Sequence, residues 1–179
     1  MNCFLKKSTR GFTLVEIVVY VAILAVISVL SINATLSMTR AFADLRVSRD
    51  LNSSATAFME RITRDVRAAY DVDEAQSTFG VNLSSSPTPR GLMLKTKDAA
   101  GANTTIEYFV SNGLVNITEG GVAQGAIMTA STNATSFIVR EVINGTTKAV
   151  KVEATISATR GDITKQRNFY TTVVLRGTY

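Results

Sequence analysis

Apolar residues follow three successive patterns along this chain. From Phe12 to Ile32 they form an almost unbroken run, which contains a single charged residue, Glu16. From Met38 onward they recur with gaps of three and four residues, and charged residues fill the positions between them. Beyond about residue 91 the period falls to two, in short segments linked by Gly-containing turns. The patterns predict an apolar helix, an amphipathic continuation of it and a set of antiparallel strands.

The first two patterns predict one continuous helix, because neither Gly nor Pro occurs between Gly11 and Gly80. We expect it to run from about Phe12 to about Tyr70, a length of roughly 90 Å. The pair Arg61 and Asp65, one turn apart, is typical of a solvated helix face. The apolar stripe that should pack on the rest of the chain comprises Met38, Phe42, Leu45, Leu51, Ala55, Phe58, Met59, Ile62, Val66 and Ala69.

The period-two segments predict antiparallel strands. The expected strands are Leu92–Lys97, Thr104–Ser111, Leu114–Thr118, Ser136–Val142, Thr147–Ala158 and Phe169–Arg176. Asn112-Gly113 and Asn144-Gly145 are typical of short hairpins, and Arg160-Gly161-Asp162 is interpreted as a turn. The segment Glu119–Ser131, rich in Gly, Ala and Thr, is interpreted as a loop. One long helix followed by such strands is an α+β fold, with the helix packed on an antiparallel sheet.

The composition limits the functions open to the chain. Its 179 residues suit one globular domain with an extension. The formal charge is +5, but the N-terminal cations Lys6, Lys7 and Arg10 supply three of those charges, so nucleic-acid binding is not indicated. The chain has no His, and its single cysteine, Cys3, excludes an intrachain disulfide. With no nucleophile–base pair and no phosphate-binding loop in view, we expect no enzymatic activity, no cofactor and no metal.

The sequence Asp71-Val72-Asp73-Glu74, which follows the predicted helix, is the one acidic cluster that bears on metal binding. Carboxylate oxygens are the ligands that calcium prefers, but this spacing fits no defined calcium loop. A solvated loop is the favoured interpretation, and a calcium site stays open as the alternative.

The N-terminal apolar run has the length of a membrane-spanning helix. Residues 12–32 would extend roughly 30 Å, the thickness of the hydrocarbon core of a bilayer. The preceding cations favour a cytoplasmic N-terminus, and a cleaved secretory signal is disfavoured because the apolar run is long and the Ala-x-Ala-like options after Ile32 are poor. An anchor alone does not explain Glu16, since a charged side chain inside such a helix costs about 3 kcal/mol.

Glu16 therefore indicates an ion-pair partner within the membrane. If the chain were cut after Gly11, the new amine at Phe12 would lie one helical turn from Glu16. A buried ion pair is tolerated when both of its members are present. The amine of a neighbouring, lengthwise-staggered helix could then pair with Glu16, which would set the register between stacked copies.

The segment from Lys7 to Val19, KSTRGFTLVEIVV, resembles the class III signal of type IV pilins and pseudopilins. The resemblance implies cleavage between Gly11 and Phe12 by the prepilin peptidase, N-methylation of Phe12, and a role for Glu16 in subunit assembly. It assigns residues 1–11 to a leader peptide whose cations are Lys6, Lys7 and Arg10.

The same resemblance implies a pilin-like fold. Residues 12–36 would form the transmembrane and filament-core helix, and residues 37–179 the soluble head. Within the head, residues 37–70 would continue the helix and residues from about 91 to 179 would form the sheet. Ala25 and Asn33 stand where many major pilins have helix-breaking Gly and Pro, which argues against a melted segment.

Three further segments are similar to J-type minor pilins and pseudopilins, namely Glu60–Ala69, Ile106–Leu114 and Val174–Arg176. The function implied is that of a minor structural subunit of a type IV pilus or a type II secretion filament. Its partners would be the inner membrane, the prepilin peptidase and methyltransferase, and other pilins or pseudopilins. The N-terminus would be cytoplasmic and the head extracytoplasmic. The alternative is a single-pass, membrane-anchored, extracytoplasmic binding module.

Overall fold

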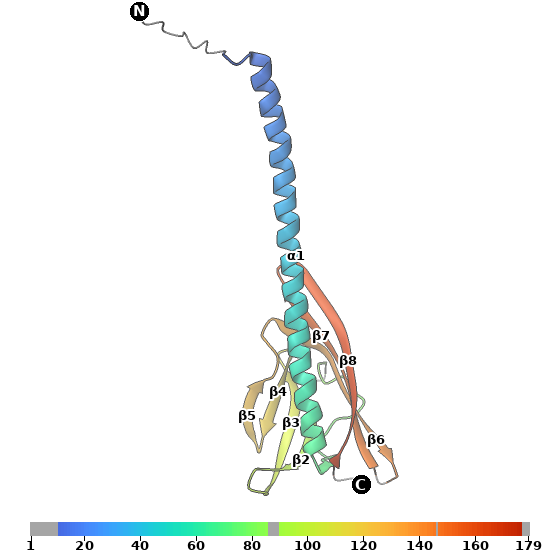
Figure 1. The fold of residues 1–179 in the computed structure, drawn as a ribbon. Helices are drawn as coiled ribbons and strands as arrows, with labels where there is room; N and C mark the ends of the chain where they lie inside the picture. The colour runs from blue at the N-terminus through green and yellow to red at the C-terminus, as the bar shows by residue number, and fades with distance from the viewer. Residues whose placement is uncertain (1–10, 86–89, 146, 177–179) are drawn as a thin grey trace, which may run out of the picture. The chain divides into compact units, whose positions relative to one another are not determined.

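The structure is a computed structural model that describes residues 11–85, 90–145 and 147–176 (Figure 1). The helix α1 (Leu14–Ala68) is followed by the strands β1 (Asp71–Val72), β2 (Leu92–Lys97), β3 (Asn103–Ser111), β4 (Leu114–Glu119), β5 (Val122–Ala126), β6 (Thr132–Asn144), β7 (Thr147–Arg160) and β8 (Ile163–Val174). The predicted α+β class, a long apolar N-terminal helix packed on antiparallel sheets, is confirmed. The chain divides after Phe42 into two compact units.

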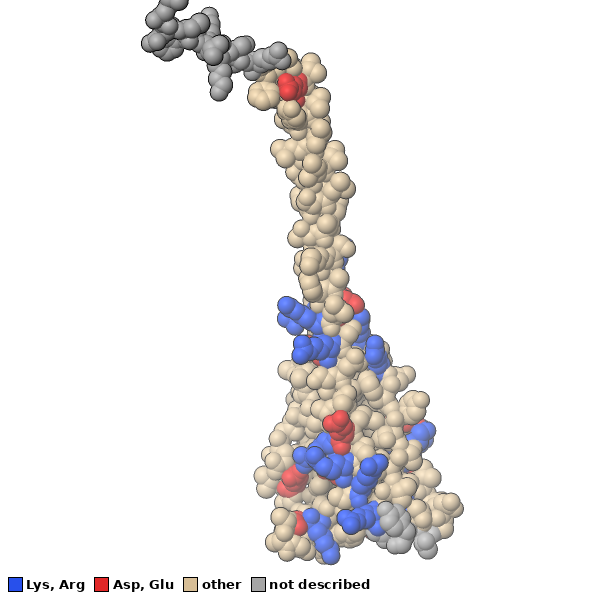
Figure 2. Space-filling model, viewed as in Figure 1, with Lys and Arg blue, Asp and Glu red and all other residues tan. Residues whose placement is uncertain are grey.

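The first unit contains the N-terminal part of α1. Thr13 caps the helix, because its hydroxyl oxygen accepts the backbone N–H of Glu16 at 3.3 Å. Further along, four hydroxyls donate to the carbonyl oxygen four residues earlier at 2.7–2.9 Å; they belong to Ser28, Ser31, Thr35 and Thr39. Such bonds satisfy polar side chains within the helix. Glu16 is the only charged residue between Phe12 and Thr39, so this part of α1 presents an almost wholly uncharged surface (Figure 2).

The second unit contains the end of α1 and two antiparallel sheets. One sheet has the strand order β1–β2–β3–β4–β5, and the other has the order β6–β7–β8. Within each sheet, every strand pairs with the strand that comes next to it in the chain. In Figure 1 the second half of α1 lies along the strands of this unit.

The hairpins follow the predicted turn residues. Asn112 and Gly113 both have positive φ, 52° and 73°, as a two-residue turn with primed geometry requires, and Ser111 pairs with Leu114. Asn144 pairs with Thr147 at the second predicted hairpin. The predicted turn at Gly161 is confirmed, since β7 ends at Arg160 and β8 begins at Ile163.

Two strand predictions were wrong in extent. The segment Glu119–Ser131 is not all loop, because Val122–Ala126 forms β5 and pairs with β4. All five residues of β5 are exposed, so the strand is held by backbone hydrogen bonds and leaves no apolar alternation in the sequence. The last strand, predicted from Phe169, begins six residues earlier at Ile163, where exposed polar residues pair along β7.

The core of the second unit lies between α1 and both sheets. Buried side chains of α1 are Val47, Leu51, Ala55, Phe58, Ile62 and Val66. The Phe58 ring meets the edge of the Phe137 ring from β6 at 5.6 Å between centroids. The first three residues of the predicted stripe are exposed, namely Met38, Phe42 and Leu45. Burial of α1 begins at Val47, which packs in a cluster with Ala158 and Ile163.

Candidate functional site

The predicted site residues lie at the start of α1. Gly11 precedes the helix, and the Phe12 side chain is 71% exposed. A Cβ added at Gly11 would meet no described atom within 4 Å. The leader cations Lys6, Lys7 and Arg10 lie outside the described residues.

Glu16 occupies the first turn of the Thr13-capped helix. A carboxylate is stabilised there by the positive end of the helix dipole. Glu16 Oε1 accepts a hydrogen bond from the Tyr20 hydroxyl at 3.1 Å. The Tyr20 ring in turn meets the Phe12 ring edge-on, at 6.3 Å between centroids. Phe12, Glu16 and Tyr20, spaced by four residues, therefore form a row along one face of the helix.

Tyr20 was not predicted from the sequence as a site residue. The signal was present, since residues four apart on a helix are neighbours and a tyrosine hydroxyl is a good donor to a carboxylate. Among the hydrogen bonds of residues 11–85, 90–145 and 147–176, none reaches Glu16 Oε2. Glu16 can therefore accept a further donor from outside the chain, as the amine of a neighbouring helix would be.

The helix that carries this row is long and apolar enough to cross a membrane. Within α1, an 18-residue window has a mean hydropathy of 2.7, and none of that window is buried. By length and composition the helix therefore supports membrane anchoring through a single span.

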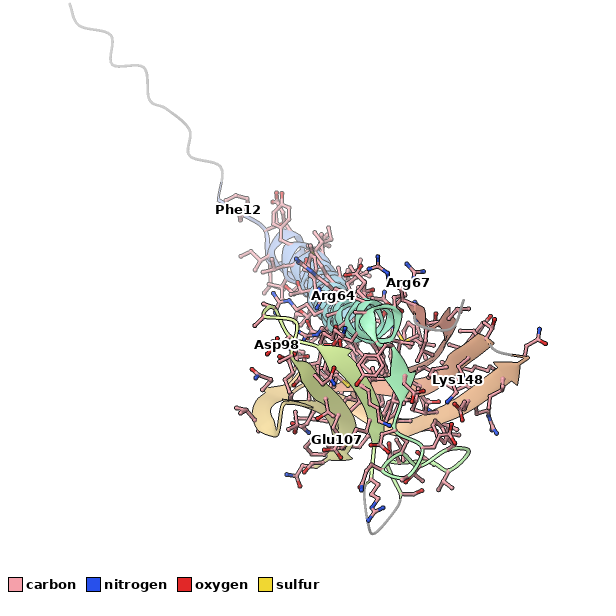
Figure 3. All side chains as sticks on the ribbon, turned by 90° about the horizontal axis from the view of Figure 1, so that it is seen from below. Phe12, Arg64, Arg67, Asp98, Glu107 and Lys148 are labelled. Carbon is pink, nitrogen blue, oxygen red and sulfur yellow. The ribbon has the colours of Figure 1, made fainter. Side chains whose placement is uncertain are left out.

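The acidic cluster after α1 is engaged by lysines. Lys148 Nζ donates to Asp71 Oδ1 at 3.0 Å and to Glu74 Oε1 at 2.8 Å, and Lys95 lies 3.8 Å from Asp71 (Figure 3 labels Lys148). Burial raises the pKa of Asp71, but the hydrogen bonds from Lys148 and the Val72 backbone, together with the charges of Lys148 and Lys95, outweigh burial and hold this pKa below its ordinary value of 3.8. The hydrogen bonds to Glu74 and Asp71 raise the pKa of Lys148.

This geometry corrects the solvated-loop interpretation of residues 71–74. Asp71 and Val72 form strand β1, and their Cα partners in β2 are Lys95 and Leu94. Within the described part of the chain, no group of three acidic, His or Cys residues is arranged to hold a metal ion. The cluster is an ion-paired junction between the end of the helix, the first sheet and β7.

A second polar cluster lies under α1. The Tyr108 hydroxyl donates to Asp65 Oδ2 at 2.5 Å, and Arg61 Nε donates to the same oxygen at 2.7 Å. Arg61 also contacts Glu119 of β4. Burial and the hydrogen bond to Asp65 raise the pKa of Tyr108. Asp65 is 6% exposed, so the interpretation of the Arg61–Asp65 pair as a solvated face was wrong. The pair fastens α1 to β3 and β4.

Comparison with protein-family models finds the prokaryotic N-terminal methylation motif at residues 6–32. This range contains Gly11, Phe12, Glu16 and Tyr20. The motif indicates a type IV pilin-like or pseudopilin protein. Neither the curated proteins nor the solved structures that were compared give a match.

The motif and the apolar helix together indicate a membrane-anchored, single-pass protein that assembles with other pilins. Proteins of this motif family are structural rather than enzymatic.

Proposed function

We propose that this chain is a minor, J-type subunit of a type IV pilus or a type II secretion filament. It waits in the inner membrane with its N-terminus in the cytoplasm and its head outside, and it enters the filament through the first part of α1. One observation carries the proposal: a lone carboxylate, Glu16, stands in an exposed apolar helix four residues after Phe12, within the matched motif.

The proposed maturation begins at the leader. Lys6, Lys7 and Arg10 hold the leader at the cytoplasmic membrane surface, where the prepilin peptidase cuts between Gly11 and Phe12. The freed amine of Phe12 is then methylated. In the filament, the amine of one subunit pairs with Glu16 of its neighbour, so that two charges in an apolar environment neutralise each other.

Replacing the carboxylate tests the assembly role. Glu16→Ala should leave the head folded, because Glu16 belongs to the first unit and makes no core contact. Incorporation into filaments, measured by immunoblotting of sheared filaments, should be lost. Glu60→Ala is the matched control, since it removes an exposed carboxylate from the same helix. Wild-type incorporation of Glu16→Ala would contradict the proposal.

Intact-mass measurement tests the maturation. The proposal expects a mature chain that begins at N-methylated Phe12, and Gly11→Glu should block the cut because a charged side chain replaces the open glycine. A full-length chain that retains Cys3 would instead support the alternative, a membrane-anchored extracytoplasmic binding module.

One observation favours that alternative. A cleft of about 590 Å³ is lined by Arg64, Arg67 and Arg176, together with Ala68 and residues 172–174 of β8 (Figure 3 labels Arg64 and Arg67). No carboxylate lines the cleft, and within the described ranges Arg67 and Arg176 form no ion pair. The cleft would suit an anionic ligand, whereas the site at the start of α1 is explained better by assembly.

A further inference from the structure

Tyr20 provides Glu16 with a hydrogen-bond donor from its own helix. The hydroxyl lies 3.1 Å from Glu16 Oε1, one turn away. Other hydroxyls of the apolar segment behave differently: Ser28 and Ser31 donate to backbone carbonyls of the preceding turn. Of the hydroxyls in the described part of this segment, Tyr20 is therefore the one that bonds to the carboxylate.

The Tyr20 ring is also held in place. Its contact with the edge of the Phe12 ring, with an interplanar angle of 76°, restrains it on the face that carries Glu16. A residue in an i,i+4 position stays within reach for as long as the helix is intact. Phe12, Glu16 and Tyr20 all lie after Gly11, so a cut at Gly11 would leave the row complete.

Within a bilayer this contact matters because lipid offers no hydrogen-bond donors to a carboxylate. A subunit that has not yet assembled has no neighbouring amine for Glu16. A donor on the same helix lowers the cost of keeping the carboxylate there, and it fixes the direction in which the second oxygen faces.

We propose that Tyr20 is the positioning residue for Glu16. Its hydroxyl holds Oε1 while the chain is unassembled and leaves Oε2 for the amine of an incoming subunit. The second part of this inference rests on the proposed filament function, whereas the first part concerns the single chain.

The contact itself is tested spectroscopically, on the full-length chain in phospholipid vesicles and without any filament. Infrared spectra with ring-labelled tyrosine report whether a tyrosine hydroxyl donates. Glu16→Ala should shift one tyrosine C–O band away from its donor-bonded position, and Tyr20→Phe should remove that band. Tyr70→Phe, the control in the head, should leave the Glu16-dependent shift unchanged. Identical tyrosine bands in the wild type and Glu16→Ala would overturn the contact.

The positioning role is tested by incorporation into filaments. Tyr20→Phe keeps the ring and its contact with Phe12 but removes the hydroxyl, so a role in packing alone predicts wild-type incorporation. We expect incorporation to fall about threefold, the factor that corresponds to a typical hydrogen bond within a membrane protein. Wild-type incorporation of Tyr20→Phe would overturn the positioning role. Normal assembly of Glu16→Ala would reject the filament function instead, and the spectroscopic result would still stand.

Discussion

The hydrogen bond between Tyr108 and Asp65 gives a quantitative test of how the head is held together. Tyr108 has no exposed surface, and its hydroxyl donates at 2.5 Å to a buried carboxylate. A hydrogen bond to a charged group contributes about 1.5–3 kcal/mol. In Tyr108→Phe, Asp65 keeps the Arg61 bond at 2.7 Å and a weaker contact with Arg64 at 3.5 Å. Because Asp65 keeps these partners, we expect Tyr108→Phe to lower the free energy of unfolding by about 2 kcal/mol.

The assay is urea unfolding of the second unit, Ala43–Tyr179, monitored by circular dichroism. The same loss should lower the melting temperature by about 6 °C for a domain of this size. Tyr170→Phe is the matched control, because the Tyr170 side chain is 79% exposed and its hydroxyl is solvated. The control should change the free energy of unfolding by less than about 0.5 kcal/mol.

A double-mutant cycle with Asp65→Ala separates the hydrogen bond from ring packing. With Ala at position 65, the Tyr108 hydroxyl loses its acceptor, so Tyr108→Phe should then cost nothing or stabilise. A similar cost in both backgrounds would refute the reasoning, since it would place the effect in the ring environment.

The pH dependence of the free energy of unfolding provides a second test of the Tyr108–Asp65 hydrogen bond. Burial, with the bond to Asp65, raises the pKa of Tyr108 above its ordinary value of 10.0. The stability that comes from the protonated phenol is therefore complete below pH 10 and is lost as the pH rises toward the raised pKa. The stability difference between the wild type and Tyr108→Phe should consequently narrow above pH 10.

Two further perturbations act elsewhere in the head. Burial and the neighbouring Glu74 raise the pKa of Glu141 by more than Lys148, whose Nζ lies 3.8 Å from Glu141 Oε1, lowers it, and this buried oxygen accepts no hydrogen bond. Folding favours the protonated form of Glu141, so the free energy of unfolding falls as the pH rises through the raised pKa. Glu141→Gln should therefore stabilise the fold by roughly 1 kcal/mol at pH 7 and have no effect below pH 4. Urea unfolding at the two pH values measures the difference. Gly91→Ala should cost at least about 2 kcal/mol, because the new Cβ would lie 1.5 Å from the carbonyl oxygen of Tyr108. Gly161→Ala, where a Cβ meets no atom within 4 Å, should cost about 1 kcal/mol, and equal costs at both glycines would contradict the steric argument.

The parts of the fold that depend on neighbouring residues could be predicted from the sequence. The long helix follows from the absence of Gly and Pro, and Asn112-Gly113 supplies the positive φ angles of its hairpin. Strand β5 could not be predicted, because all of its residues are exposed and its pairing with β4 leaves no periodic pattern. The division of the strands between two sheets depends on contacts between distant segments, which no local pattern records.

Of the candidate site, Glu16 could be predicted from the sequence and Tyr20 could not. Glu16 is conspicuous because a charge in an apolar run is costly, whereas Tyr20 looks like one more aromatic residue of the run. The place of Asp65 was also hidden from the sequence. Arg61 and Asp65 have the spacing of a solvated pair, and the burial of Asp65 depends on Tyr108, which lies 43 residues further along.

The hydroxyl bonds in the first unit have a mechanical consequence. The carbonyl oxygens of Leu24, Ile27, Ser31 and Thr35 each receive a side-chain hydroxyl from the next turn. An oxygen that already accepts a hydroxyl holds its backbone N–H less firmly, which makes such turns easier to bend. The turns of residues 24–39 should therefore bend more easily than turns whose carbonyl oxygens accept only backbone N–H groups.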